Sequence, residues 1–143
     1  MRRLRLFASI LAISFAVPGA VPQSAEKNLK FEIVRPTVIA YFAPNKKAAS
    51  IDDEAGEAYE DFQLYANRAE ISLEREGIEF HEVYARSFHV GTGAKLVKFS
   101  ASKSGVGYYL IAPGKKPRIE YGVMTDIDLL SVAHEYFGMS SRR

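Results

Sequence analysis

The chain of 143 residues contains no cysteine and no tryptophan. Without cysteine it has no disulfide, no thiolate nucleophile, no thiolate metal site and no acylated cysteine of a lipoprotein signal. A folded domain must therefore be held together by its apolar core, for which roughly 120 residues are enough. Without tryptophan an aromatic recognition platform is also less favoured, so we expect most of the 8 Tyr and 9 Phe side chains to pack in the core.

Apolar runs long enough to cross a membrane are missing as well. The uncharged, mostly apolar run Leu6–Val17 follows three arginines and precedes small residues, whereas a spanning helix needs about 20 apolar residues. This order predicts a cleavable signal peptide over residues 1–25, with cleavage after Gly19, Ala20 or Ala25. An uncleaved amphipathic anchor is the weaker alternative, because the run has no polar face. We expect export to the bacterial periplasm or outside the cell, and no membrane span after removal of the signal.

The mature chain has no strong excess of charge of one sign. The full sequence carries 19 Lys and Arg against 17 Asp and Glu. Three of the arginines lie within residues 1–25, so 16 basic and 17 acidic side chains would remain and the net charge would be −1. Nucleic acid is therefore not an expected partner, because binding its phosphates requires an excess of positive charge.

One domain is predicted at residues 37–138, after a leader or edge strand at 26–36 and before a tail at 139–143. The run 37–43 is nearly continuous in apolar, β-branched and aromatic residues, which is typical of a strand buried on both faces. Residues 51–76 then change to three- and four-residue spacing of apolar side chains, which predicts a long amphipathic helix.

The second half of the domain is predicted to be richer in strands. Residues 78–84 alternate as a strand, so the domain begins with a β-α-β unit whose strands are parallel. The stretch 86–104 contains many Gly and Ser residues, and we expect an irregular excursion there, with strand character at 95–99. Strands at 108–112 and 118–121 flank a Pro-Gly turn and predict an antiparallel hairpin.

A helix is predicted at the end of the domain. Thr125, with Asp128 three residues later, resembles a capping box, and apolar side chains follow at helical spacing. Gly138 is a natural residue to end this helix.

This order of strand, long helix, strand, irregular stretch, hairpin and helix resembles the thioredoxin-like fold. The run 38–44 looks like the first central strand of that family, and residues 105–138 look like its C-terminal β-β-α half. The resemblance implies an α/β fold, a three-layer sandwich with one central mixed β-sheet. Where the family has Cys-x-x-Cys, residues 46–49 read Lys-Lys-Ala-Ala, and where it has a cis-proline, residues 105–107 read Gly-Val-Gly. We expect trans peptide bonds there, because a cis bond without proline costs about 2.5–4 kcal/mol.

The resemblance implies a redox-silent member that acts as a binding or interaction module without a cofactor. Thiol–disulfide exchange requires a thiolate, which this chain lacks. The family's usual contact surface lies at one end of the sheet, where an extended peptide or another envelope protein could lie against exposed backbone. The residues of this chain at that surface are Pro44, Asn45, Lys46, Lys47, Gly105, Val106 and Gly107.

Several lysines, including the two of this surface, occur at positions that we place in loops. These are Lys46, Lys47, Lys95, Lys98, Lys103, Lys115 and Lys116. Two of the groups flank the end of the sheet where α/β proteins commonly bind ligands and could form an anion-attracting rim. Solvated loop lysines are the simpler interpretation, which we favour.

The histidines support a different class of function. An envelope hydrolase without cysteine could use His81 or His89 with a carboxylate, and a metal site would require the two side chains to converge. His81 and Glu82 are neighbours on a predicted strand and should point to opposite faces, while His134 suits the C-terminal end of the last helix. No Gly-x-Ser-x-Gly elbow is present. We therefore assign no catalytic or metal-binding residue; a structural protein of a secreted assembly is the third possibility.

Overall fold

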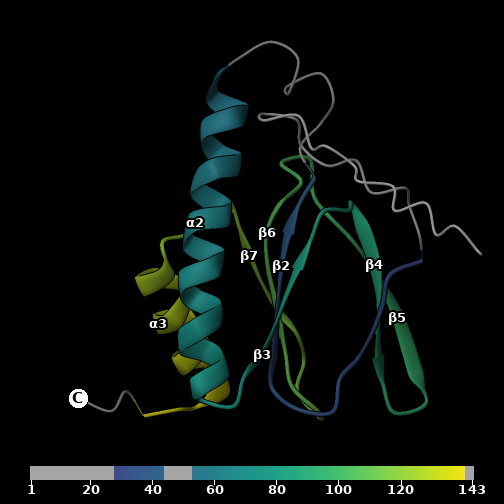
Figure 1. The fold of residues 1–143 in the computed structure, drawn as a ribbon. Helices are drawn as coiled ribbons and strands as arrows, with labels where there is room; N and C mark the ends of the chain where they lie inside the picture. Colours follow the sequence, from purple (N-terminus) through teal and green to yellow (C-terminus); the bar gives the residue numbers. More distant parts are fainter. Residues whose placement is uncertain (1–27, 44–52, 141–143) are drawn as a thin grey trace, which may run out of the picture.

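The computed structural model describes residues 28–43 and 53–140 and shows a mixed α/β fold with two sheets and two helices. In chain order the elements are β1 (Lys30–Glu32), β2 (Thr37–Phe42), α2 (Asp53–Arg75), β3 (Glu79–Val83), β4 (Ser87–Thr92), β5 (Lys95–Ser100), β6 (Val106–Ile111), β7 (Arg118–Tyr121) and α3 (Asp126–Phe137). Both helices lie on one face of the four-stranded sheet, and the three-stranded sheet lies on its other face (Figure 1). Neither described helix is both long and apolar enough to cross a membrane.

The four-stranded sheet has the order β3-β2-β6-β7. β2 and β3 are parallel and are joined by α2, which confirms the predicted β-α-β unit. β6 pairs antiparallel with β2 on one side and with β7 on the other, which confirms the predicted hairpin. The strands of this sheet thus lie close to their predicted bounds, although β6 begins at Val106 rather than at the expected residue 108.

β2 is the centre of the molecule because it is covered on both faces. All six of its residues are buried. Val38, Ala40 and Phe42 pack toward the helices, whereas Ile39 and Tyr41 pack toward the second sheet. The absence of an alternating polar face in the sequence is explained by this double burial.

The two helices bury the faces that their spacing predicts. In α2 the buried side chains are Phe62, Ala66, Ala69 and Leu73. α3 begins at the predicted cap, where Thr125 Oγ1 accepts a hydrogen bond from the backbone N–H of Asp128 at 3.2 Å, and it ends at Gly138 with φ 71°. The C-terminal ends of the two helices are linked by His134 Nε2 and Glu76 Oε2, 2.5 Å apart.

The expectation of an irregular excursion at residues 86–104 is wrong, whereas the strand character expected at 95–99 is confirmed by β5. β4 and β5 form a regular antiparallel hairpin, and β1 adds to β4 in parallel, so the chain builds a second sheet of order β1-β4-β5. Gly93 has φ +60° and Ala94 does not have a positive φ, as the two-residue type II′ turn requires. Gly91, another glycine of this stretch, lies within regular β4. The predicted single sheet is therefore accompanied by another layer of strands.

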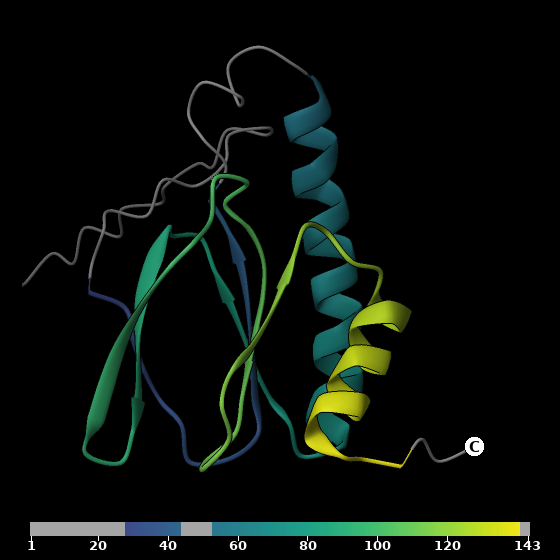
Figure 2. The same cartoon turned by 180° about the vertical axis from the view of Figure 1, so that it is seen from behind.

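Aromatic side chains fill the space between the two sheets. Phe88 of β4 is 1% exposed. Its ring lies 5.8 Å from that of Phe31 and 4.8 Å from that of Phe99 within its own sheet, and 6.3 Å from Tyr41 and 5.8 Å from Tyr109 of the other sheet. The layers are thus helices, four-stranded sheet and three-stranded sheet, as Figure 2 shows from behind.

Candidate functional site

The predicted contact surface is only partly within the described residues. Pro44, Asn45, Lys46 and Lys47 lie outside them. Gly105, Val106 and Gly107 are all buried. The carbonyl oxygen of Gly105 accepts from the N–H of Ala43 at 2.7 Å, and that of Val106 accepts from the N–H of Gly122 at 2.9 Å. Because β6 is paired on both sides, these three residues present no open backbone edge to a peptide.

Gly107 has a packing role instead. The ring of Tyr41 in the neighbouring strand lies over it: a Cβ atom at residue 107 would lie 2.2 Å from the carbonyl oxygen of Glu120 and 2.6 Å from the Tyr41 hydroxyl oxygen. Burial raises the pKa of Tyr41 to about 12, and its hydroxyl group has no hydrogen-bond partner within residues 28–43 and 53–140. The expected trans geometry is confirmed, since the described residues contain no cis peptide bond.

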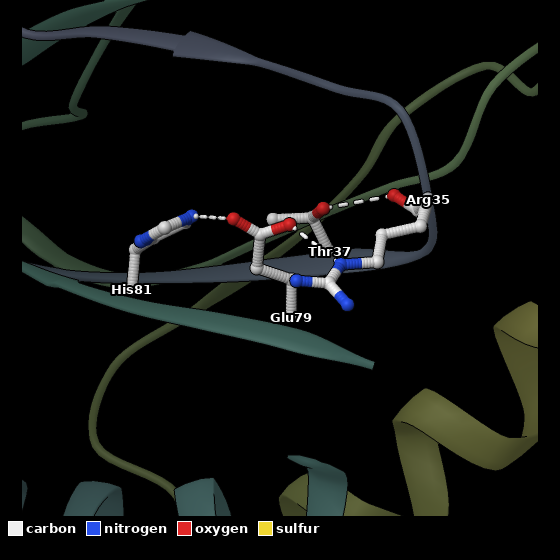
Figure 3. A network of polar contacts seen from close by, with 4 residues as sticks. All are labelled: Arg35, Thr37, Glu79 and His81. Carbon is white, nitrogen blue, oxygen red and sulfur yellow. Dashed lines mark hydrogen bonds and ion pairs between the residues drawn. The ribbon is translucent and has the colours of Figure 1, made fainter. Parts of the chain in front are cut away.

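A polar network lies at the opposite end of β2 and β3 (Figure 3). Glu79 is the first residue of β3, and its carboxylate accepts from Arg35 Nε at 2.9 Å and contacts His81 Nε2 at 2.8 Å. His81 follows two residues later on the same face of the strand, and its ring centroid lies 4.8 Å from that of Phe31. The Thr37 hydroxyl donates to the carbonyl oxygen of Arg35 at 2.9 Å and fixes the turn that carries this arginine.

The electrostatics of this network keep the carboxylate charged. The hydrogen bond from Arg35 is the main cause that lowers the pKa of Glu79 below its ordinary value of 4.5; His81 acts in the same direction and burial opposes both. Glu79 can therefore orient the His81 ring, as a carboxylate does in a hydrolase. Glu79 is nevertheless the only hydrogen-bond partner of His81 in the part of the chain that the structure describes, so no hydroxyl nucleophile is placed beside it.

The two histidines of the hydrolase hypothesis are not brought together. His89 lies between Phe88 and Val90, which are buried against the other sheet, so its side chain points to the outer face of β4. His81 points toward the space between the sheets. In residues 28–43 and 53–140 there is no group of three or more metal-ligating side chains.

Glu82 lies on the helix side of β3, opposite to His81 as predicted. Burial, and then the charge of Glu70, raise the pKa of Glu82. Near it, the Gln63 amide donates to the hydroxyl oxygens of Tyr59 at 2.9 Å and of Tyr84 at 3.2 Å. These contacts tie α2 to the edge strand β3 and give this cluster a structural role.

Replacing Glu79 by glutamine is expected to flatten the acid limb of the stability profile. The folded-state pKa of Glu79 is lowered, so its contribution to stability is present above the ordinary, unfolded pKa of 4.5 and is lost as the pH falls through the folded pKa. The free energy of unfolding of the wild type should thus fall more steeply than that of Glu79→Gln below about pH 4.5. Urea titrations between pH 3 and 7 measure this, with Glu57→Gln on the exposed face of α2 as the control; equal slopes for the wild type and Glu79→Gln would contradict it.

The described structure does offer an open backbone edge, in β5. In the three-stranded sheet β4 uses alternate residues to reach β1: the N–H of His89 donates to Leu29 O at 2.7 Å, and Gly91 O accepts from the N–H of Ile33 at 2.8 Å. The residues between them therefore turn their backbone groups toward β5.

The alternation continues through β5. Val97 and Phe99 lie opposite Val90 and Phe88 of β4 and use their backbone groups for that pairing. The N–H and C=O groups of Leu96, Lys98 and Ser100 then point away from β4, and no described strand pairs with that side. Among the described strands, β5 is thus a free edge over its whole length.

Most side chains of β5 are also exposed to solvent. The first four residues are exposed, and only Phe99 anchors the strand in the core. Leu96 is 53% and Val97 is 42% exposed, between two lysines. Lys95 and Lys98 lie on this strand, as the strand character expected at 95–99 indicates, and not in loops. The sequence signal that could have found this hairpin is Gly93-Ala94 between two runs that each tolerate β-structure.

No family model, curated protein or solved structure matches this chain. Its function must therefore be inferred from the fold and from the surfaces described above.

Proposed function

We propose that the chain is an exported, redox-silent interaction module of thioredoxin-like topology, which binds an extended segment of another protein along the free edge of β5. The strands of the β-α-β unit and of the antiparallel hairpin form one mixed sheet in the order of elements that the resemblance implies, and the closing helix packs on it. The absence of cysteine leaves no group for thiol–disulfide exchange. Its place of action would be the bacterial periplasm or the extracellular space.

The β4–β5 hairpin supports this role by its position. It lies where the family normally has a helix between the second and third core strands. A helix pairs its own backbone groups, whereas β5 leaves the backbone groups on one side without a described partner strand. Backbone groups that point to solvent from a sheet edge are a template for an added strand. The proposal rests on one observation about Leu96 and Lys98. Their backbone N–H and C=O groups point away from β4, and their side chains are exposed to solvent.

A protective role for the two lysines must be weighed against this. Natural edge strands often carry lysine to prevent pairing with other chains. In β5, however, the lysines enclose two exposed apolar residues, Leu96 and Val97, where a purely protective edge would be polar throughout. Two lysines that flank two apolar residues are better suited to selecting one kind of partner strand than to preventing the addition of any strand.

The alternative of a cysteine-independent hydrolase is favoured by one contact, the hydrogen bond between Glu79 and His81. It is the weaker candidate. The carboxylate of Glu79 already accepts a hydrogen bond from Arg35, and no described residue places a hydroxyl nucleophile beside the His81 ring.

Replacing Leu96 by proline is expected to abolish strand addition while preserving the fold. The N–H of Leu96 points to the free side, so proline removes a donor that β4 does not use. As a probe we choose the peptide Ac-Thr-Gln-Val-Val-Gln-Thr-NH2, which is extended, neutral and free of proline. It should bind the wild type with a Kd on the order of 1 mM and shift the backbone amide signals of residues 96 and 98 in NMR spectra.

Two matched variants define this experiment. Leu96→Ala keeps the N–H and should keep most of the binding, whereas Val97→Pro removes a bond to β4 and should lower the melting temperature instead. Leu96→Pro should melt close to the wild type and bind at least fivefold more weakly. If the peptide shifts no signal in β5, or binds Leu96→Pro as well as the wild type, strand addition at β5 is refuted.

A further inference from the structure

Basic side chains from all three strands of the second sheet stand in one row. Lys30 of β1 lies opposite His89 of β4, and His89 lies opposite Lys98 of β5. Side chains of directly opposite residues in neighbouring strands are about 4.5–5.5 Å apart at Cβ. The two lysines are thus separated by a single imidazole.

The row lies on the outer face of the sheet. Phe88 and Val90, on either side of His89, are buried between the sheets, so His89 and the residues opposite it point outward. Lys30 and Lys98 are exposed. Neither forms an ion pair with a carboxylate in the described residues, although Glu32 lies on the same face of β1.

Such a row is not explained by the stability of the sheet. The ammonium groups of Lys30 and Lys98 repel each other across β4, so the row adds no cross-strand attraction to the sheet. A strand added beyond β5 would place its own residue next to Lys98, at the open end of the row. A carboxylate at that place would be attracted by Lys98 directly and by the rest of the row at longer range.

The side chains along β5 restrict the bound segment at more than one of its positions. β5 reads Lys95-Leu96-Val97-Lys98 along its exposed part. A partner strand that matches it must place acidic residues opposite the lysines and apolar residues opposite Leu96 and Val97. Because the pattern is symmetrical, the complement is the same for a parallel and an antiparallel partner.

We infer that the segment bound along β5 carries the pattern acidic–apolar–apolar–acidic, with one carboxylate at the end of the row formed by Lys30, His89 and Lys98. This inference rests on the proposed strand addition and names the chemistry of its partner. A second copy of the chain fits poorly, because aligning the two apolar pairs of two antiparallel β5 strands sets Lys95 of one copy against Lys98 of the other.

Peptide charge tests the inference separately from strand addition. The acidic peptide Ac-Thr-Glu-Val-Val-Glu-Thr-NH2 has the shape of the neutral probe and differs only in charge. At low salt it should bind about tenfold more tightly than the neutral peptide, and Ac-Thr-Lys-Val-Val-Lys-Thr-NH2 should bind more weakly than either. At about 1 M salt, where the Debye length is about 3 Å, the preference should be lost.

Exposed lysines supply the matched variants. Lys95→Gln combined with Lys98→Gln should lose most of the preference for the acidic peptide, with only the part that Lys30 supplies left, while Lys103→Gln, in the turn after β5, should keep the tenfold preference. Lys30→Gln should lose part of the preference, because it removes the far end of the row.

The outcomes separate the two proposals. Neutral and acidic peptides that bind β5 with equal affinity would overturn the inference and leave strand addition in place. An acidic peptide that binds tightly to both the wild type and Leu96→Pro would show binding to the sheet face, which overturns strand addition. A dimer in sedimentation experiments that Leu96→Pro dissociates would make a second copy the occupant and overturn the inference.

Discussion

Gly107→Ala is expected to destabilise the protein by about 3 kcal/mol, because the new methyl group has no space. Its carbon would lie 2.2 Å from the carbonyl oxygen of Glu120 and 2.6 Å from the Tyr41 hydroxyl oxygen. The first contact is with the backbone of a paired strand and the second with a fully buried ring, so neither can move without disturbing the centre of the sheet. Urea denaturation followed by circular dichroism measures the loss.

The same substitution at Gly56 is the matched control. Gly56 is exposed in α2, and an added Cβ would meet nothing within 4 Å. Gly56→Ala should therefore stabilise the protein by about 0.5–1 kcal/mol through helix propensity. Tyr41→Phe, added to Gly107→Ala, should recover only part of the loss, because the contact with Glu120 remains. A cost below about 1 kcal/mol for Gly107→Ala would contradict the close packing of β6 under Tyr41.

Phe88→Ala should cost about 3–5 kcal/mol and loosen the second sheet from the first. The Phe88 side chain is 1% exposed and contacts aromatic rings of both sheets. With two sheets sharing one aromatic core, the wild type should unfold in a single transition. Urea unfolding followed by hydrogen exchange of the amides of β2 and β4 checks both expectations.

The neighbouring position provides the control for this substitution. His89 points to the outer face, so His89→Ala should change the free energy of unfolding by no more than about 0.5 kcal/mol. If β4 and β5 lose protection in an earlier transition than β2 in the wild type, the second sheet is a separately unfolding unit and the shared-core account is wrong.

The sequence predicted best those elements whose pattern is local and uninterrupted. The apolar run at 37–43 gave the central strand because burial on both faces removes polar residues from it. The spacing of Phe62, Ala66 and Leu73 gave the buried side of α2, and Thr125 with Asp128 gave the start of α3. In each case the side chains that determine the structure lie within a few residues of one another.

The second sheet was predicted only in part, through the strand character at 95–99, for the opposite reason. Gly91 and Gly93 are the same residue type two positions apart, yet one continues a strand and the other makes a turn with φ +60°. Their difference follows from the pairing of β4 with β1, a segment far away in the chain. Nothing in residues 86–104 alone shows that pairing, so their Gly and Ser content by itself predicts irregular structure.

The exposure of the backbone at a candidate site depends on the same kind of non-local information. Gly105, Val106 and Gly107 are buried because β7 pairs beside β6, whereas β5 is open because no described strand follows it in its sheet. Whether a strand lies at an edge depends on the strand order of the whole sheet. The alignment of Lys30, His89 and Lys98 likewise depends on register across three strands, so the sequence alone does not bring these residues together.

The short length of β5 limits how long any complex on it can last. Leu96, Lys98 and Ser100 each have one backbone donor and one acceptor on the open side, so an incoming strand gains at most six main-chain hydrogen bonds. At about 0.5–1.5 kcal/mol each, and after the cost of ordering a free segment, these bonds support fast dissociation rather than permanent assembly. Durable attachment would need several such modules acting together on one target.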